Sequence, residues 1–419
     1  MSGSERTFVG FGFGPIQSGL FLYEAYRSGN FDRYVIAEVD APLVDAVQAT
    51  GGRYQINIAH PDHIEQVAVE GVRLYHPARP EDRRKLVRAI AEADELATAL
   101  PSVQFYDSGD SSSVVSLLAD GLGQRDPDRP AIIYAAENHN HAAEILGDAL
   151  RDRVPDRSRA KIQTLNTVVG KMSGVVTDGD TIARLELAPL TPETPRAVLV
   201  ERFNHILISR VTLDGFQRGI QVFVEKDDLL PFEEAKLYGH NAIHALIGFL
   251  AERRGLTTMA QAAEHDDILI TARAAFLDES GAALIEKYGH LNEPLFTRDG
   301  YQASAEDLLQ RMFNPHLNDL VARVTRDARR KLAYDDRLFG TMRLALNHGI
   351  RPRHMARGAA AALCSPEIPS IGSQAELRSA LCDIWGPQDD AWAESLIDLT
   401  WQAMREAGSM KGAHGARML

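Results

Sequence analysis

The sequence predicts an α/β protein, with alternating strands and helices in its first half and a mostly α-helical second half. Short apolar runs alternate with helix-like segments up to about residue 195. Helical periodicity prevails from Pro231 almost to the end. The length of 419 residues also exceeds one ordinary hydrophobic core. We therefore predict domains at residues 1–195 and 196–405, with a small-residue, disordered tail at 406–419.

The first half contains four expected strands and four expected helices. Strands are expected at Thr7–Gly10, Arg33–Val39, Arg53–Ile58 and Pro130–Ala136. Helices are expected at Pro15–Ser28, Leu43–Ala49, Arg83–Ala99 (with a further apolar segment after it) and Ala142–Leu150. Strands separated by helices are typical of a parallel, doubly wound sheet.

The second half contains few strand candidates. Phe203–Leu213 and Ile220–Val224 are compatible with strands. Helical periodicity covers Phe232–Arg254, Met259–Glu264, Asp267–Tyr288, Ala305–Met312, Leu317–Asp327, Phe339–Leu346, Arg353–Leu363, Gln374–Ile384 and Asp390–Glu406. This part is therefore expected to be a helical domain.

Charge and cysteine content narrow the functional classes. The net charge of −13 argues against nucleic acid or an anionic membrane as the main partner, but not against a small anionic substrate. Two cysteines, Cys364 and Cys382, make neither a disulfide framework nor a structural zinc site. The chain shows no signal peptide and no long apolar span, so we expect a soluble, cytoplasmic protein.

A glycine-rich turn, GFGFGPIQSG, follows the first expected strand and precedes a helix. This is the context of the phosphate-binding turn in a Rossmann-type domain. Gly12 would form the tight turn, and Gly14 would let backbone N–H groups approach a pyrophosphate at the helix N-terminus. Gln17 stands where the third glycine is usual, with Gly19 two residues later. A glycine-rich turn without a cofactor is the alternative.

The acid at the end of the second strand indicates the cofactor. Glu38 lies 24 positions after Gly14, where a carboxylate bonds the ribose 2′-OH and repels a 2′-phosphate. NAD is thus favoured over NADP, unless Glu38 is merely a solvated acid; Asp40 is a weaker candidate for the same role. The expected cofactor contacts are Gly12, Gly14, Pro15, Ile16, Gln17, Glu38 and Thr98.

The segment Pro231–Gly255, here called the lysine helix, carries Lys236, Asn241 and His244. At about 100° per residue these side chains fall within an arc of about 140°. A desolvated lysine can act as a general base, and an asparagine amide can donate to a developing alkoxide. His244 would bind substrate hydroxyls or orient Lys236. The alternative is a surface lysine and a core histidine.

A second asparagine, Asn138, follows the strand Pro130–Ala136, at an edge where open α/β sheets bind ligands. It would complete an oxyanion site with Asn241. The neighbouring His139 and His141 invite a metal interpretation, but their spacing with Glu137 and Glu144 matches no recognised zinc pattern. We therefore expect no metal.

Several motifs in order resemble the polyol-specific long-chain dehydrogenases, the mannitol dehydrogenase family. They are FGFGPIQSG, AAENHNHAAE, KLYGHNAIHA, RAAFLDESGAALIEKYG and RMFNPHLNDLVARVTRDARRKLAYDDRL. The resemblance implies that Lys236 is the general acid/base, that Asn138 and Asn241 polarise the reacting oxygen, and that His244 positions the substrate. It also implies metal-independent chemistry and a monomer or small homo-oligomer.

The chain departs from the family pattern at Gln17, at the HNH sequence after Asn138, and in HILISRVTL. There Ser209 replaces an aspartate that usually contacts the polyol, whereas Arg210 is kept. Arg330 and Lys331, with Arg326, form a basic cluster suited to a substrate phosphate. The alternative is that these are surface charges paired with Asp327, Asp335 and Asp336.

The expected function is reversible NAD-dependent oxidation of a secondary alcohol in a polyol or polyol phosphate, at an active site between the two domains. One alternative is a dehydrogenase of an unphosphorylated polyol or sugar acid. The other is a catalytically silent NAD-binding regulator.

Overall fold

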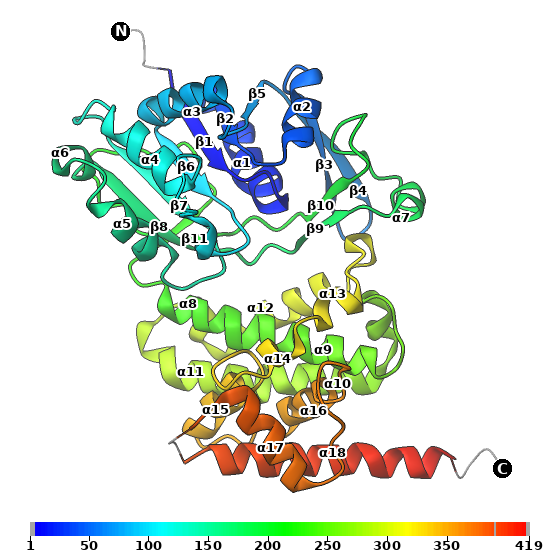
Figure 1. Ribbon diagram of the computed structural model, residues 1–419. Coiled ribbons are helices and arrows are strands. Elements are labelled where there is room, and N and C mark those ends of the chain that lie inside the picture. The colour runs from blue at the N-terminus through cyan, green and yellow to red at the C-terminus, as the bar shows by residue number, and fades with distance from the viewer. Residues whose placement is uncertain (1–4, 389–390, 416–419) are drawn as a thin grey trace. The chain divides into compact units, whose positions relative to one another are not determined.

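Six strands of the first half form the parallel sheet that the alternation predicts (Figure 1). The structure is a computed structural model that describes residues 5–388 and 391–415. The eight strands of the main sheet follow the order β12-β11-β8-β7-β6-β1-β2-β5. They are β1 Thr7–Phe11, β2 Arg33–Ala37, β5 Val72–Tyr75, β6 Glu95–Thr98, β7 Ala131–Ala135, β8 Ile162–Val168, β11 Leu207–Ser209 and β12 Val224–Lys226.

The strand order identifies a Rossmann-type sheet and confirms the predicted fold class. From β5 to β8 all neighbours are parallel, and β11 joins β8 antiparallel. The chain runs outward from β1 to β2 and β5, then returns to the other side of β1 with β6, β7 and β8. The order therefore reverses between β1 and β6, which is where such sheets bind ligands.

Both faces of this sheet are covered. In β1, Phe8 belongs to one hydrophobic core, which includes Phe21, whereas Val9 and Phe11 belong to another, which includes Leu86. The helices of this part are α1 Leu22–Ser28, α2 Ala41–Ala49, α3 Pro80–Glu92, α4 Val114–Gly123, α5 Ala142–Arg151, α6 Asp156–Arg159 and α7 Gly179–Arg184. Burial on both faces explains why the central strands are almost continuously apolar.

A second sheet, which the sequence did not predict, has the order β4-β3-β10-β9. Its strands are β3 Tyr54–Ala59, β4 Ile64–Val69, β9 Ser173–Val176 and β10 Ala197–Glu201. Because β10 pairs with β3, and β11 pairs with β8, the chain beyond residue 195 still belongs to the first fold. The chain divides into a first unit, Met1–Leu230, and a second unit, Pro231–Leu419, so the boundary falls later than residue 195.

Three expected elements of the first unit differ in the structure. The helix expected at Arg83–Ala99 ends at Glu92, and residues Glu95–Thr98 form β6, a fully buried strand. The strand expected at Phe203–Leu213 is reduced to β11. The strand expected at Ile220–Val224 begins only at Val224.

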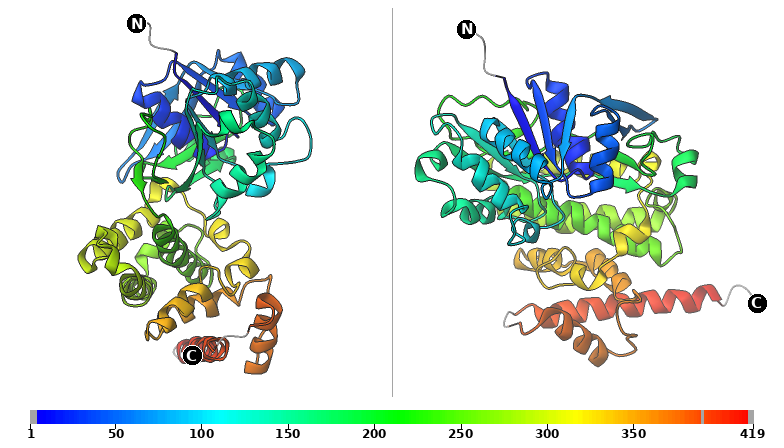
Figure 2. Two further views of the ribbon diagram at one scale, coloured as in Figure 1. Left: turned by 90° about the vertical axis from the view of Figure 1, so that its left-hand side faces the viewer. Right: turned by 45° about the horizontal axis from the view of Figure 1, so that its top comes forward.

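The second unit is helical, as predicted (Figure 2). Its α-helices are α8 Leu230–Glu234, α9 Ala242–Glu252, α10 Asp266–Ala274, α11 Ala282–Tyr288, α12 Arg298–Met312, α13 Val321–Thr325, α14 Ala328–Lys331, α15 Phe339–Asn347, α16 Arg353–Ala362, α17 Gln374–Trp385 and α18 Ala393–Gly415. Because α18 continues to Gly415, residues 406–415 of the predicted tail are helical. Residues 416–419 lie outside the described residues.

Three helices predicted as continuous contain a π-helical turn: η1 Gln17–Phe21, η3 Ala235–Asn241 and η5 Ala275–Gly281. A π-turn bonds residue i to i+5 and is frequent at functional sites. One of these turns, η3, holds both Lys236 and Asn241.

Two further properties of the described residues bear on the expectations. Cys364 and Cys382 are both exposed, free thiols. Within the described ranges, none of the helices has both the length and the apolar character that crossing a membrane requires.

Candidate active site

The glycine-rich turn lies where the strand order reverses. Gly12 adopts φ = +81°, and its N–H donates to the carbonyl of Ala37 at 2.8 Å. A Cβ at Gly12 would come within 3.1 Å of the carbonyl oxygen of Ala99, so only glycine fits. A Cβ at Gly14 would meet no atom within 4 Å, which leaves open space above the start of the helix. This is the arrangement that a pyrophosphate needs.

Gln17 takes part in packing under this turn. Its side chain is fully buried and occupies the place that a Cβ on Gly10 would need. Neither its amide nitrogen nor its amide oxygen has a hydrogen-bond partner. Gly19 is also constrained, because a Cβ there would approach Val200 of β10 to 2.6 Å. The absence of a side chain at Gly10 therefore allows the close helix–strand packing that the third glycine usually provides. Pro15 and Ile16 are the first helical residues after the turn.

Glu38 directly follows β2 at the same sheet edge. Its Oε1 accepts from the backbone N–H of Asp40 at 2.8 Å, whereas Oε2 accepts from no other described residue. Asp40 is instead the N-cap of α2, accepting from Leu43 N at 3.2 Å, and pairs with Arg196 at 2.9 Å. Glu38 thus keeps an acceptor oxygen that a ribose hydroxyl can use, and the turn and this acid together fit NAD.

Thr98 is the last residue of β6, and Asn138 lies three residues after the end of β7. The hydroxyl of Thr98 is fully buried and donates to Glu137 Oε2 at 2.9 Å. Glu137 also accepts from Leu100 N at 2.9 Å and from the hydroxyl of Tyr106. Glu137 is therefore a buried anchor for the loop after β6, a role that sequence reasoning missed. The side chain of Asn138, next to it, is exposed at the sheet edge.

The histidines after Asn138 are also exposed, and the ring centroids of His139 and His141 lie 6.2 Å apart. No group of three or more histidine, cysteine, aspartate or glutamate residues in the described part of the chain is arranged to hold a metal ion.

Ser209 and Arg210 lie at the end of β11. The Ser209 hydroxyl accepts from the backbone N–H of Asn166 at 3.2 Å. Arg210 is about half exposed and pairs with Asp227, with Nη2 at 3.1 Å from Oδ2. Both side chains therefore have protein partners within the first unit.

In the second unit, the π-turn η3 sets the geometry of the lysine helix. Lys236 and Asn241 are five residues apart, and an i→i+5 turn places such residues one above the other. They are therefore better aligned than the 140° arc of a regular α-helix implies. Burial and the nearby Arg337 lower the pKa of Lys236 to about 8, although Glu233 opposes this shift. A lysine with this pKa can exchange a proton near neutral pH.

The π-turn is held by hydroxyl groups from two other helices. The Tyr238 carbonyl accepts from Ser280 Oγ at 2.8 Å and lies 3.2 Å from Thr341 Oγ1. Ser280 belongs to η5 and Thr341 to α15, and both residues are fully buried. The backbone between Lys236 and Asn241 is thus fixed by neighbouring side chains.

His244 is oriented by a buried carboxylate. Its Nε2 lies 2.8 Å from Asp319 Oδ2, and Asp319 Oδ1 accepts from Arg323 Nε at 2.9 Å and Nη2 at 2.7 Å. Burial raises the pKa of Asp319, but the hydrogen bonds and charges of His244 and Arg323 outweigh it and hold the pKa below its ordinary value. With Asp319 ionised, we assign the proton to Nε2, which leaves Nδ1 as an acceptor.

Two neighbours of Lys236 were not predicted as site residues. His240 stands one turn before His244, with ring centroids 6.1 Å apart. Burial, followed by the charges of His244, Arg311, Lys236 and Arg337, holds the pKa of His240 well below its ordinary range. Arg337 follows α14 in sequence, and its side chain is 12% exposed. These two residues lie far apart in the chain, so no local motif marked them as a pair.

The predicted phosphate residues have other partners. Lys331 is 4% exposed, and its Nζ donates to the backbone carbonyl of Arg326. Burial and the charges of Arg337 and Arg330 lower the pKa of Lys331 to about 8. Arg330 is half exposed and lies 3.4 Å from Asp336. Lys331 therefore closes a local turn. Arg330 is a surface residue that pairs with Asp336, which agrees with the alternative that these basic residues are paired surface charges.

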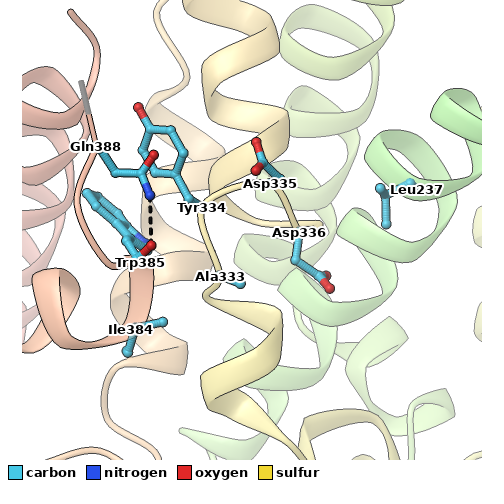
Figure 3. Close-up of a pocket in the computed structure, with 8 residues that line it drawn as sticks. All are labelled: Leu237, Ala333, Tyr334, Asp335, Asp336, Ile384, Trp385 and Gln388. Carbon is cyan, nitrogen blue, oxygen red and sulfur yellow. Dashed lines mark hydrogen bonds between the residues drawn. The ribbon is translucent and has the colours of Figure 1, made fainter. Parts of the chain in front are cut away.

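A cavity of about 380 Å³ lies beside the lysine helix (Figure 3). It is lined by Leu237, Ala333, Tyr334, Asp335, Asp336, Ile384, Trp385 and Gln388. Gln388 donates to the Trp385 carbonyl at 2.7 Å. None of Lys236, Asn241 and His244 lines this cavity, so it is separate from these candidate residues.

A Rossmann-type sheet together with a helix that carries a low-pKa lysine indicates a class, the dehydrogenases. Residues 228–365 match the family model described as the mannitol dehydrogenase C-terminal domain. The chain is 30% identical over 361 residues to mannitol-1-phosphate 5-dehydrogenase of Anoxybacillus flavithermus, covering 85% of this chain and 86% of the relative. For the enzyme of that name from Bacillus pumilus, identity is 28%, covering 93% and 98%. The chain belongs to the mannitol dehydrogenase family.

Solved structures give the same fold. The ternary complex of Pseudomonas fluorescens mannitol 2-dehydrogenase with NAD and D-mannitol has a TM-score of 0.70 at 14% identity, covering 100% of this chain and 96% of that one. Substrate-free D-sorbitol dehydrogenase has a TM-score of 0.72 at 14% identity, covering 97% and 96%. At this level of identity, the likeness establishes the fold.

Proposed function

We propose that this protein is an NAD-dependent dehydrogenase that interconverts a polyol phosphate and the corresponding keto sugar phosphate. The lysine helix carries the proposal: Lys236 and Asn241 both belong to its π-turn, five residues apart, and Asp319 orients His244 one turn further on. The relatives named mannitol-1-phosphate 5-dehydrogenase, at 28–30% identity over most of the chain, support the substrate class.

In the proposed reaction, Lys236 accepts the proton of the reacting hydroxyl as hydride leaves the carbinol carbon. In the reverse direction, it returns that proton to the carbonyl oxygen. The amides of Asn241 and Asn138 would donate to the oxygen as negative charge develops. Nδ1 of His244 would accept from a substrate hydroxyl and so hold the polyol in register.

The first unit supplies the residues that would hold NAD: Gly12 and Gly14 at the pyrophosphate, and Glu38 at the ribose. Bound NAD would supply the hydride acceptor. The free Oε2 of Glu38 supports NAD over NADP, since a 2′-phosphate would be repelled by this carboxylate.

The second candidate function is a dehydrogenase of an unphosphorylated polyol or a sugar acid. It is favoured by the partners of Lys331 and Arg330, because the ammonium of Lys331 already donates to a backbone carbonyl and Arg330 already pairs with Asp336. A non-catalytic NAD-binding regulator is the weaker alternative, since binding alone requires no aligned base.

A substrate panel tests these functions. Polyols, their phosphates and sugar acids are assayed with NAD and with NADP by absorbance at 340 nm. We expect turnover with a polyol phosphate and NAD. Turnover confined to unphosphorylated substrates would support the second candidate, and NAD binding without turnover of any substrate would support the regulator.

Replacement of the base tests the mechanism. We expect Lys236→Ala to lower kcat by about 10²–10⁴-fold, the usual contribution of general acid–base catalysis, without changing NAD affinity. Lys85→Ala, which removes a half-exposed lysine of the first unit, is the control. Normal turnover by Lys236→Ala would disprove the assigned role.

We also propose that the protein acts in the cytoplasm, which its two free cysteines support. We further propose that it is a monomer or a small homo-oligomer. Light scattering after gel filtration measures the oligomeric state.

A further inference from the structure

Arg337 is attached to the lysine helix through its backbone. The hydroxyl of Thr341 donates to the Arg337 carbonyl at 2.6 Å and lies 3.2 Å from the Tyr238 carbonyl inside the π-turn. At Gly340, a Cβ would approach the Tyr238 ring to 2.6 Å, so the two segments are in close contact. The position of Arg337 is therefore fixed relative to Lys236, two residues before Tyr238.

The guanidinium of Arg337 is only partly used by the protein. Its Nε donates to Asp336 Oδ1 at 2.7 Å. Neither Nη1 nor Nη2 has a hydrogen-bond or ion-pair partner among the described residues, and neither is sealed from solvent. The side chain is nevertheless only 12% exposed. The two outer nitrogens can therefore donate to a ligand that reaches them, and covering them without an acceptor would be unfavourable.

The surroundings of Arg337 carry excess positive charge. Arg337 lies close enough to Lys236, His240 and Lys331 to lower the pKa of each. Its one carboxylate partner, Asp336, is shared with Arg330. An anion bound at Nη1 and Nη2 would offset this charge beside the reacting centre.

We infer that the two outer nitrogens of Arg337 bind the phosphate group of the substrate, which makes Arg337 the residue that selects phosphorylated polyols. The planar guanidinium fork matches two phosphate oxygens at once. This inference rests on the proposed function and assigns the phosphate to Arg337 instead of Arg330 and Lys331.

The test compares Arg337→Gln with Arg330→Gln. The two variants remove the same charge from two arginines that both pair with Asp336, so Arg330→Gln is the matched control. Each is assayed with mannitol 1-phosphate, mannitol and a sugar acid, and its fold is checked by circular dichroism. Loss of charge-assisted hydrogen bonds predicts that Arg337→Gln lowers kcat/KM for the phosphate by about 100-fold, mainly through KM. Measured at a pH where kcat/KM has levelled off in both proteins, any activity with mannitol stays within a few-fold, and Arg330→Gln resembles the wild type.

Three results would overturn the inference: equal losses on phosphorylated and unphosphorylated substrates, a larger loss with the sugar acid, or a larger loss in Arg330→Gln. If the wild type oxidises none of the substrates, the proposed function fails, and the subsite is tested with inorganic phosphate. An increase in Tm with phosphate in the wild type but not in Arg337→Gln would support the subsite. Equal increases, or none, would overturn it.

Discussion

Lys236 owes its expected reactivity to its neighbours. An ordinary lysine at pH 7 is neutral in about one molecule in 3,000, whereas a pKa of about 8 makes the neutral share about one tenth. Burial is the main cause, and the adjacent Arg337 adds to it. The residue that we assign to the substrate phosphate thus also tunes the base.

The pH dependence should follow from this pKa. In the proposed mechanism, oxidation requires neutral Lys236, so kcat/KM for the alcohol should rise with pH and level off above about 8. Reduction requires the protonated form, so it should decline above the same pH. Arg337→Gln should move the midpoint upward, because a like charge is removed. Profiles measured in both directions from pH 6 to 10 test this, and a flat profile would contradict it.

Asp319 should act on the reaction through His244. Asp319→Asn keeps the shape but removes the charge that fixes Nε2–H and binds Arg323. We expect kcat/KM for the polyol to decrease by about 10- to 100-fold, mainly through KM, with NAD affinity unchanged. The control Asp267→Asn removes an exposed ion pair with Arg254 and should have no effect. A decrease in stability with normal kinetics would assign Asp319 a purely structural role.

At the scale of the element, the start of the first helix contains an unusual buried amide. Gln17 lies against Gly10 with both polar atoms unpaired. An unpaired buried polar group costs about 1–3 kcal/mol. Gln17→Met has similar volume and should therefore raise the free energy of unfolding by about 1–2 kcal/mol in urea denaturation.

The control for this prediction is Gln48→Met, since the Gln48 amide donates to the Leu74 carbonyl at 2.7 Å and its loss should be neutral or destabilising. A destabilised Gln17→Met would show that the amide is satisfied in solution. Reduced NAD affinity in that variant would instead support the predicted contact of Gln17 with the cofactor.

Most strands and helices were predictable, because apolar residues repeat with different periods in the two kinds of element. The glycine-rich turn was predictable because it lies between a strand and a helix. The π-turns were not, since they shift one hydrogen-bond register and leave hydrophobic periodicity almost unchanged. Asp319 and Arg337, which we propose as site residues, were also missed, because each lies far in sequence from the lysine helix. Conversely, the local cluster of basic residues suggested Lys331 as a phosphate-binding residue, but in the structure its ammonium group donates to a backbone carbonyl.

At the scale of the whole molecule, the two units carry different reporters. All three tryptophans, Trp385, Trp392 and Trp401, belong to the second unit, whereas the proposed NAD turn belongs to the first. NAD at 100 times its Kd should stabilise the first unit by about 2.7 kcal/mol. We expect the circular dichroism transition, to which both units contribute, to extend to higher denaturant while tryptophan fluorescence is unchanged. An equal shift of both signals would mean that the units unfold together.

The π-turn at Ala235–Asn241 also affects which single-residue deletions the lysine helix can tolerate. A turn that spans one residue more than an α-turn behaves as a single-residue insertion within a helix. Removing one residue between Lys236 and Asn241 would leave these two residues four positions apart, and a regular α-helix with about 3.6 residues per turn keeps such residues on one face. The same deletion outside the π-turn, between Asn241 and His244, would instead rotate His244 by about 100° away from the other two side chains. Within this helix, the π-turn is therefore where the loss of a single residue is best tolerated.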